Sequence, residues 1–526
     1  MWNNIFRFFN TIIYLKPIQL FYLFFYRMKN LFYYKKKFNS KYKFNGFINW
    51  HDQIFSLKSY NRNLSFNFLN ISKHFSNKID WNFSEHGKLW VYNLNYFDFL
   101  NQQEISAETG VKLIKDYVKN KKNLKDGREP YPISLRGINW IKFLSKNKIK
   151  NSSINTILHN DYSLLNNNLE YHLLGNHLLE NAFSLLFGAY YFKNCKFYNK
   201  SKKLLILELE EQILSDGGHF ELSPMYHQII FSRLLDCIYL IKLNPLWQKD
   251  DLLSFLENKA SYMNSWLYNI TYKNGNIPMV NDSTFNIAHK SEKLFSYAKH
   301  LNIKYNEIPL SSSGYRKISN DTYELFLDIG NIGPNYQPGH SHSDTFNFEL
   351  IKNSKPVFVD SGISTYEKNK KRQIERSTCS HNTVEIGGEN QTDVWGGFRV
   401  AKRANITKLE EKSNFIEASH NGYVSQGYIH TRSFLWEKKE IILIDKISKS
   451  TSNTAKAFFH LHSSLAKPLV SGKNVILKSL EMYIEFESAS KIYIEEYQLS
   501  KGFNKSSLAF KIVVIFDQIL KTKIKL

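Results

Sequence analysis

The chain has 526 residues, a hydrophobic fraction of 43% and a formal net charge of +23 at pH 7. At this length two domains are the default expectation, because one core rarely organises more than about 250–300 residues. The charge favours an anionic partner. Nucleic acid is not expected, since only 12 of the 70 basic residues are Arg and no zinc-finger or RNA-binding pattern is present. The three cysteines, Cys195, Cys237 and Cys379, are too few for a disulfide framework.

The first fifty residues contain nine Lys or Arg and no Asp or Glu, and aromatic residues crowd into FRFFNTIIYLKPIQLFYLFFYR. Lys16 and Pro17 interrupt the apolar run, which leaves no stretch of about 18–20 apolar residues for a spanning helix. No small-residue cleavage site follows, so a signal peptide is poorly supported. Two interpretations stay open: a segment lying on an anionic membrane surface, or a helix packed on the rest of the chain. Both a cytoplasmic and a membrane-peripheral location fit.

Hydrophobic periodicity changes once along the chain, near Ser311 to Gly314. Before this point, apolar residues at helical spacing predict helices at 133–144, 164–187, 202–214, 227–241 and 258–270. After it, a period of two predicts strands at 323–330, 345–351, 356–362, 415–423, 438–448, 455–464, 482–488, 492–499 and 510–516. Helices followed by strands favour an α+β multidomain chain over a doubly wound fold. The expected parts are 1–50, 51–310 and 311–526.

The segment GHSHSDTFNFEL places His340, His342 and Asp344 just before a predicted strand. Histidines two residues apart on an extended backbone point the same way. Asp360 in VFVDSG and His381 in SHNTVEIGG follow beside further strands. A His, an Asp and a His from neighbouring strands can form a three-ligand metal site, for which zinc is the natural candidate. Hydrogen-bonding histidines on a polar sheet face remain the alternative.

Two polar groups interrupt the predicted helices. Asn176, His177, Glu180 and Asn181 recur in NHLLEN, inside an otherwise apolar run. Because buried polar groups cost free energy unless paired, this set either forms an internal network or lines a cleft. Further on, DGGHFELSPMYH passes Ser223 and Pro224 and enters a helix near Met225, which places Tyr226 and His227 in its first turn.

These blocks, with IPMVNDS and HNTVEIGG, resemble the heparinase II/III-like polysaccharide lyases, a group that also includes exo-acting alginate lyases. The resemblance covers roughly residues 80 to 480, by the order of the six blocks. It implies an N-terminal (α/α) toroid of stacked helical hairpins followed by a C-terminal antiparallel β-sandwich. It also implies periplasmic export, which the N-terminus puts in doubt.

The resemblance assigns roles to seven residues. Asn176 and His177 match the family's Asn-His pair, Tyr226 its catalytic Tyr, and His340 its sandwich histidine. His342, Asp360 and His381 match the zinc ligands. The implied activity is cleavage of a uronate-containing anionic polysaccharide, of glycosaminoglycan or alginate-like type, by β-elimination.

This chemistry has its own requirements. Removal of the weakly acidic proton at C5 demands that the neighbouring carboxylate be neutralised, which Asn176 and His177 can do by donating hydrogen bonds. A base must take the proton and an acid must protonate the O4 leaving group; Tyr226 and His340 are the candidates. Arg136, Asn139 and Trp140 in PYPISLRGINW could line a sugar cleft. Asn181 and His227, next to the catalytic candidates, are predicted to contact substrate as well.

Two other functions remain open on the sequence. One is a non-catalytic glycan-binding or membrane-associated scaffold that keeps the fold without turnover. The other is a zinc-dependent hydrolase, in which an open metal position activates water. No paired carboxylates of the glycoside-hydrolase kind stand out, although Glu180, Glu221 and Glu349 keep hydrolysis under consideration. A second His-x-His pair, His460 and His462, is assigned a structural role.

Overall fold

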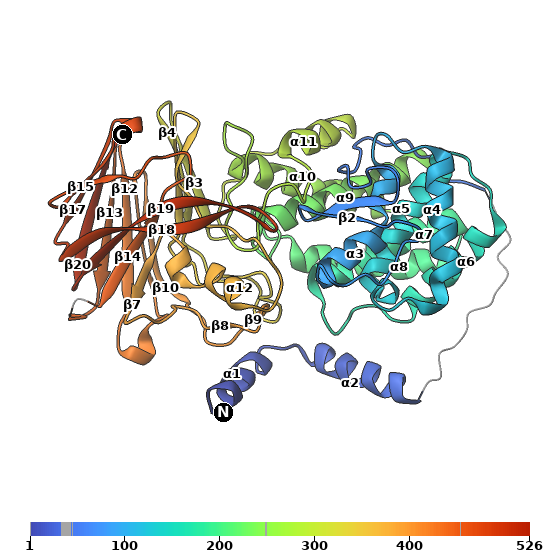
Figure 1. Ribbon diagram of the computed structural model, residues 1–526, viewed down its shortest axis with the longest axis horizontal. Helices are drawn as coiled ribbons and strands as arrows, with labels where there is room; N and C mark the ends of the chain where they lie inside the picture. The colour runs from blue at the N-terminus through green and yellow to red at the C-terminus, as the bar shows by residue number, and fades with distance from the viewer. Residues whose placement is uncertain (1, 33–43, 45, 248–249, 453) are drawn as a thin grey trace.

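The computed structural model describes residues 2–32, 44, 46–247, 250–452 and 454–526. Its architecture is a helical N-terminal region followed by a C-terminal region of antiparallel sheets, as the change of periodicity predicts (Figure 1). The predicted boundary at residue 310 lies in the loop between α11, which ends at His300, and β3, which begins at Tyr315.

Helices make up most of the first region. They are α3 (Lys88–Tyr96), α4 (Ala107–Asn120), α5 (Pro130–Lys146), α6 (Ser152–Asn166), α7 (Gly175–Phe192), α8 (Cys195–Gln212), α9 (Pro224–Leu243), α10 (Leu252–Ile270) and α11 (Ser291–His300), with the small hairpin β1 (Ser65–Phe68) and β2 (Ile71–His74). Trp90, Trp140 and Trp266 are fully buried in the core that these helices share. Apolar residues at helical spacing lie on one face of each helix, and these faces pack together to form the core of this region.

The expected helix at 164–187 is broken in the structure. Helix α6 ends at Asn166 and α7 begins only at Gly175, after a turn in which Leu174 and Gly175 both have positive φ, of 61° and 55°. Apolar periodicity continues through the turn because Leu169 and Leu174 are buried in the same core. The break brings Asn176 and His177 to the first turn of α7, where their backbone and side chains face another element.

The second region contains three main sheets. One has eight strands in the order β10-β11-β12-β13-β20-β17-β16-β15, one the order β18-β19-β14-β7, and one the order β3-β4-β5-β6. The strands are β3 (Tyr315–Ser319), β4 (Tyr323–Asp328), β5 (Phe348–Lys352), β6 (Lys355–Phe358), β7 (Val384–Ile386), β10 (Ile406–Lys412), β11 (Phe415–His420), β12 (His430–Trp436), β13 (Glu440–Ile447), β14 (Ala455–His460), β15 (Leu469–Ser471), β16 (Asn474–Leu477), β17 (Met482–Glu487), β18 (Lys491–Gly502), β19 (Lys505–Phe516) and β20 (Ile519–Lys525). Buried residues from all three sheets form one apolar core.

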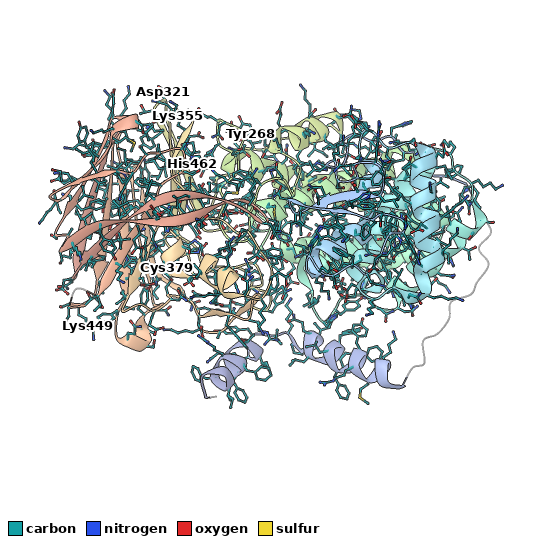
Figure 2. All side chains as sticks on the ribbon, in the orientation of Figure 1. Tyr268, Asp321, Lys355, Cys379, Lys449 and His462 are labelled. Carbon is teal, nitrogen blue, oxygen red and sulfur yellow. The ribbon has the colours of Figure 1, made fainter. Side chains whose placement is uncertain are left out.

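Short elements at the boundary complete the second region. They are α12 (Lys370–Glu375) and the hairpin β8 (Val394–Trp395) and β9 (Arg399–Val400). Figure 2, which shows the side chains on the ribbon, labels two residues of this region considered on sequence grounds, Cys379 and His462. Cys379 is a free thiol. His462 bonds Ser464 Oγ through Nδ1 at 2.8 Å and lies 2.7 Å from Lys501 Nζ through Nε2, in keeping with a structural role.

Residues 2–32 contain two helices that run along one side of the molecule (Figure 1). Helix α1 (Trp2–Ile12) lies beneath β8, β9 and α12, and α2 (Pro17–Phe32) lies beneath the helical region in this view. Within the described residues, no single helix is both long and apolar enough to cross a membrane. Ile5–Ile12 and Pro17–Lys29 meet that criterion only when taken together, and they are bent by 112° relative to each other.

Candidate active site

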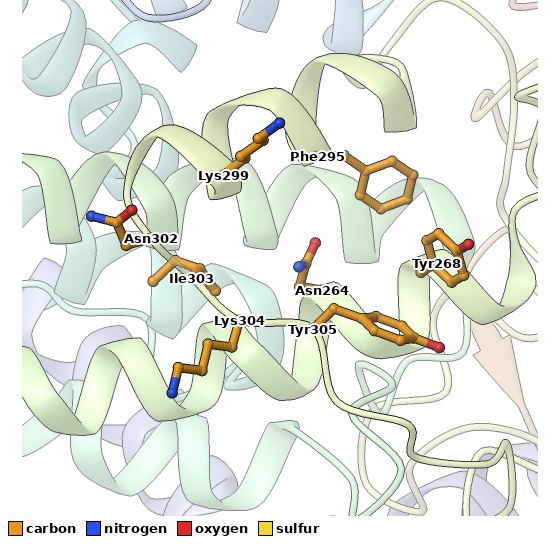
Figure 3. Close-up of a pocket in the computed structure, with 8 residues that line it drawn as sticks. All are labelled: Asn264, Tyr268, Phe295, Lys299, Asn302, Ile303, Lys304 and Tyr305. Atoms are coloured by element: carbon orange, nitrogen blue, oxygen red, sulfur yellow. The ribbon is translucent and has the colours of Figure 1, made fainter.

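A cleft of about 1150 Å³ lies between the helical and the sheet regions. Its lining includes Asn176, His177, Tyr226 and His340, the four predicted catalytic residues, although they come from two regions and are up to 164 positions apart. A smaller cavity of about 630 Å³ lies at α10 and α11 (Figure 3). None of the predicted site residues lines the smaller cavity, so the larger cleft is the candidate active site.

Tyr226 and His340 meet face to face across the cleft. Their ring centroids are 3.9 Å apart and the planes are inclined by 30°. Tyr226 lies in the first turn of α9, which Ser223 caps by accepting a hydrogen bond from the Tyr226 amide, as the Ser-Pro start predicts. Burial raises the pKa of the Tyr226 phenol above its usual value. At neutral pH this side chain is therefore a neutral phenol with a proton to donate.

Asp282 determines how His340 is presented. Its Oδ2 lies 2.8 Å from His340 Nδ1, and Arg372 Nη2 donates to the same oxygen at 2.7 Å. Burial alone would raise the pKa of Asp282, but Arg372 and the two histidines hold it well below the usual range, so the group is a carboxylate. A carboxylate at Nδ1 favours a proton on that nitrogen. The Nε2 atom of His340 faces the cleft and lies 3.5 Å from both Asn176 Nδ2 and Glu221 Oε2.

Asn176 faces the same point from the helical side. Its Nδ2 donates to Glu221 at 3.0 and 2.8 Å and lies 3.5 Å from His340 Nε2. The Asn176 backbone amide also donates to Glu221 Oε1 at 3.0 Å. A Cβ on Gly175 would come within 2.6 Å of that carboxylate oxygen, so glycine permits this close approach.

His177 is held by a carboxylate of its own. Its Nδ1 lies 3.0 Å from Glu170 Oε1, and its ring lies 4.5 Å from that of Tyr131. Burial disfavours the charged imidazole, but Glu170 and other carboxylates together outweigh it, so the pKa of His177 is raised. Asn181 donates to the other oxygen of Glu170 at 2.9 Å. A carboxylate-bound histidine of this kind is suited to an anionic sugar group.

The predicted substrate-binding residues divide into two groups. Asn139 lines the cleft and donates to the Tyr96 carbonyl at 2.9 Å. The other four lie behind the wall of the cleft: Arg136 pairs with Asp161 at 3.1 Å, Trp140 is fully buried, Asn181 bonds Glu170, and His227 lies between the Met263 carbonyl and the His219 amide. Their prediction as substrate contacts is not matched by their positions, because helical periodicity does not distinguish a cleft-facing residue from its neighbour one position further round the helix.

Beside the cleft lies a closed cluster, made of His342, Asp344 and His381. One ligand-type atom from each falls within 4.8 Å of the others. His342 Nδ1, Asp344 Oδ2 and His381 Nε2 are buried without a hydrogen-bond partner among the described residues. Burial raises the pKa of Asp344 to about 6 and lowers the pKa of His342 to about 3. Three buried ligand-type atoms that lie close together without hydrogen-bond partners are what a cation site requires.

Asp360, predicted as the carboxylate ligand, lies outside this group of three. It accepts from Asn347 Nδ2 at 2.6 Å, and the same oxygen lies 2.8 Å from His381 Nδ1. The carboxylate within the group is that of Asp344. His342 has a matching arrangement, since its Nε2 lies 2.9 Å from Asp282 Oδ1. Each histidine is thus oriented by a carboxylate on its far nitrogen, which is the usual support of a metal-binding imidazole.

Sequence reasoning assigned no role to four residues at this site. Tyr131 and Tyr366 line the cleft, and Asp282 and Arg372 lie behind His340. Glu221, considered on sequence grounds only for hydrolysis, accepts hydrogen bonds from Asn176. The Tyr366 hydroxyl donates to that of Tyr226 at 3.3 Å. A signal for Asp282 was available, because it lies in IPMVNDS, one of the six blocks that carry the resemblance. Tyr366 and Arg372 carried no comparable signal, since they lie in a loop and a short helix.

Comparison with known families gives this geometry a context. Residues 131–305 match the model described as Heparinase II/III N-terminus, and residues 304–525 match Heparinase II/III-like, C-terminal. The chain belongs to the heparinase II/III-like family. A heparin-sulfate lyase of Bacteroides thetaiotaomicron is 26% identical over an alignment of 326 positions, and the match covers 53% of this chain and 44% of that protein. The chain thus matches about half the length of such curated relatives.

Solved structures agree on the fold of this heparinase II/III-like chain. The crystal structure of heparinase III has a TM-score of 0.68 at 18% identity, covering 86% of this chain and 80% of the other. A heparan sulfate lyase mutant from Pedobacter heparinus has a TM-score of 0.58 at 18% identity, covering 88% and 81%. The two-region architecture is therefore shared over 86–88% of this chain and 80–81% of those two structures.

Proposed function

We propose that this protein is a polysaccharide lyase that cleaves a uronate-containing anionic polysaccharide of heparin or heparan type by β-elimination. The observation that carries the proposal is the meeting of Tyr226, His340 and Asn176 at one point of the cleft. The lyase names of the matched relatives support the class of reaction. In the same proposal the helical region is an (α/α) toroid and the three sheets form a β-sandwich.

The residues divide the reaction as follows. Asn176 and His177 receive the uronate carboxylate and stabilise the negative charge that develops when C5 loses its proton. His340, with Nδ1 held by Asp282, offers Nε2 to accept that proton. Tyr226, kept neutral by burial, donates its proton to the O4 leaving group. The C4–O4 bond breaks as the C4–C5 double bond forms, so the products are a new hydroxyl end and an unsaturated uronate.

We also propose that zinc occupies the cluster of His342, Asp344 and His381. Two imidazole nitrogens and one carboxylate oxygen suit zinc by ligand type. When bound, the ion supplies positive charge that offsets the buried carboxylates and fixes the sheet-side wall of the cleft. His342 and His340 contact the two oxygens of the same carboxylate, Asp282. An ion that holds His342 in place therefore also restrains Asp282 and, through it, the orientation of His340.

A panel of glycans tests the reaction. Purified protein is incubated with heparan sulfate, heparin, alginate and chondroitin, and absorbance of the unsaturated uronate is followed in the ultraviolet. A lyase produces the absorbing end on at least one glycan. New reducing ends without absorbance would indicate a hydrolase, and binding without either product would indicate a scaffold. Elemental analysis of the same protein should find close to one zinc per chain; a stable, metal-free protein would contradict the zinc assignment.

A further inference from the structure

Helices α1 and α2 expose their apolar faces, whereas an ordinary surface helix buries its apolar face and exposes its polar one. Eleven large apolar side chains between residues 5 and 25 are exposed, against fifteen in the rest of the described chain. They are Ile5, Phe6, Phe8, Phe9, Ile13, Ile18, Leu20, Phe21, Leu23, Phe24 and Phe25. In Figure 2, side chains extend from the outer side of both helices, away from the body of the molecule. An apolar surface this concentrated marks a binding face.

The opposite face of α1 is fastened to the sheet region by polar contacts. Arg7 pairs with Asp393 at 2.9 Å, and Thr11 donates to the Val400 carbonyl at 3.3 Å. These two residues are four positions apart and therefore lie on one side of the helix. The exposed Phe6, Phe9 and Ile13 lie on the others. The inward direction of α1 is thus set by bonds to β8 and β9.

Helix α2 repeats this arrangement on the helical region. Gln19 donates to the Leu173 carbonyl at 3.3 Å, Tyr22 stacks on Tyr171 with centroids 4.6 Å apart, and Tyr26 donates to the Leu169 carbonyl at 2.5 Å. Lys16, just before the helix, pairs with Glu211. The pair therefore bridges both regions along its inner face, and cannot turn its apolar face inward without breaking these contacts.

Length and bend determine how a membrane would meet this face. The 11 and 16 residues of α1 and α2 are about 16 and 24 Å long at 1.5 Å per residue, short of the roughly 30 Å hydrocarbon core. With a bend of 112° and one face bound to protein, the pair lies along a surface rather than across it. This is the geometry of an interfacial amphipathic helix.

Charge selects the surface. The first acidic residue is Asp52, while the first fifty residues carry nine Lys or Arg, with Arg27 exposed on α2. A two-fold dimer would set this acid-free segment against itself, like charge to like. Anionic lipid headgroups offer the opposite charge together with an apolar interior for the phenyl groups.

We propose that α1 and α2 bind the surface of an anionic lipid bilayer and anchor the protein in the plane of the membrane. The same pair contributes Thr11, Leu15, Gln19 and Leu23 to the lining of the cleft. A docked protein therefore holds the cleft beside the headgroups, where a glycan attached to or emerging from the membrane is within reach. The proposal goes beyond the lyase activity and does not depend on it.

Co-sedimentation with vesicles tests the proposal. Full-length protein is mixed with vesicles of phosphatidylglycerol and phosphatidylcholine, or of phosphatidylcholine alone. The test variant changes Phe6, Phe9, Phe21 and Phe24 to Ser; these side chains are 60–70% exposed and do not line the cleft. The control changes four side chains of comparable exposure elsewhere, Leu207, Val424, Tyr483 and Leu508, to Ser.

We expect wild-type and control proteins to sediment with the anionic vesicles, less so at raised salt, and the test variant to lose more than about 100-fold in partitioning because four phenyl groups no longer insert. Melting temperature and turnover of soluble glycan should be unchanged in both variants. Wild-type protein that ignores anionic vesicles, or a test variant that binds equally, overturns the proposal. So does equal binding to neutral vesicles, or a wild-type dimer that the four substitutions dissociate without any vesicle binding.

Discussion

His340 and His342 are two residues apart and share one carboxylate, yet they belong to different kinds of site. His340 bonds Asp282 Oδ2 and turns Nε2 to a cleft large enough for sugar residues, whereas His342 bonds Asp282 Oδ1 and turns Nδ1 into a closed cluster. In the proposed function the open site handles a transient proton and the closed one holds a permanent charge. The difference lies in what each free nitrogen faces, since the residue type is the same.

The largest expected effect separates the open site from the closed one. Tyr226→Phe removes a hydroxyl from the cleft and keeps the ring stacked on His340, so glycan binding and melting temperature should be preserved. Turnover should fall by about 10²–10⁴-fold, the usual contribution of a positioned acid or base. Steady-state kinetics with the best glycan of the panel measures it. A variant as fast as wild type would refute the proposed proton donor while leaving the family assignment intact.

Asp282→Asn strikes both sites at once. The substitution leaves the buried Arg372 without its partner and removes the carboxylate that orients both histidines. Breaking a buried pair in this way costs about 3–5 kcal/mol of folding stability. Chemical denaturation should show this loss, together with reduced turnover in the folded fraction and reduced metal content. Asp321→Asn, on an exposed turn, is the matched control and should change none of the three.

His381→Ala should affect the closed site alone. It removes one proposed ligand, so zinc content should fall and thermal stability with it, because binding energy in such a site contributes directly to folding. His460→Ala, also buried in the sheet region but outside the cluster, should keep its zinc. If His381→Ala retains stoichiometric metal, the ion is held elsewhere. Asp360→Asn sharpens the test: as a supporting residue it should weaken metal binding by about 10–100-fold rather than abolish it.

Tyr226 and His227 on α9 differ in the same way as His340 and His342, because Tyr226 faces the cleft and His227 faces the core. Burial lowers the pKa of His227 to about 3. In the unfolded chain His227 has a pKa near 6.5, so below that pH the unfolded chain binds a proton that the folded chain does not bind. The contribution of His227 to the free energy of unfolding is therefore present above pH 6.5 and is lost as the pH falls toward 3. Between pH 7 and pH 5 this group should cost about 2 kcal/mol. Urea denaturation at pH 7 and pH 5 measures this. The free energy of unfolding of His227→Gln should fall between the two pH values by about 2 kcal/mol less than that of the wild type. An equal fall in both proteins would contradict the lowered pKa of His227.

The sequence by itself determined the order of the two regions and the residue types of the site. Apolar residues recur about every 3.6 residues in the first region and every two residues in the second. This period indicates which face of each helix or strand is buried without knowledge of the elements packed against it. The start of α9 was also predictable, since Ser223 and Pro224 act locally on the first turn. The NHLLEN, SPMYH and GHSHSD blocks brought Asn176, His177, Tyr226 and His340 to attention before any of them could be placed in space.

Tertiary structure decided which way each polar side chain turns. Asn181 and His227 share helices with Asn176 and Tyr226, but packing turns them inward to Glu170 and to the Met263 carbonyl. Asp344 and Asp360 offer the same carboxylate, and only the packing of the loops between strands decides which one points at the two free imidazole nitrogens. Periodicity assigns a residue to a face of its own element; contacts between elements distant in sequence decide whether that face meets a cleft, a closed polar cluster or the core.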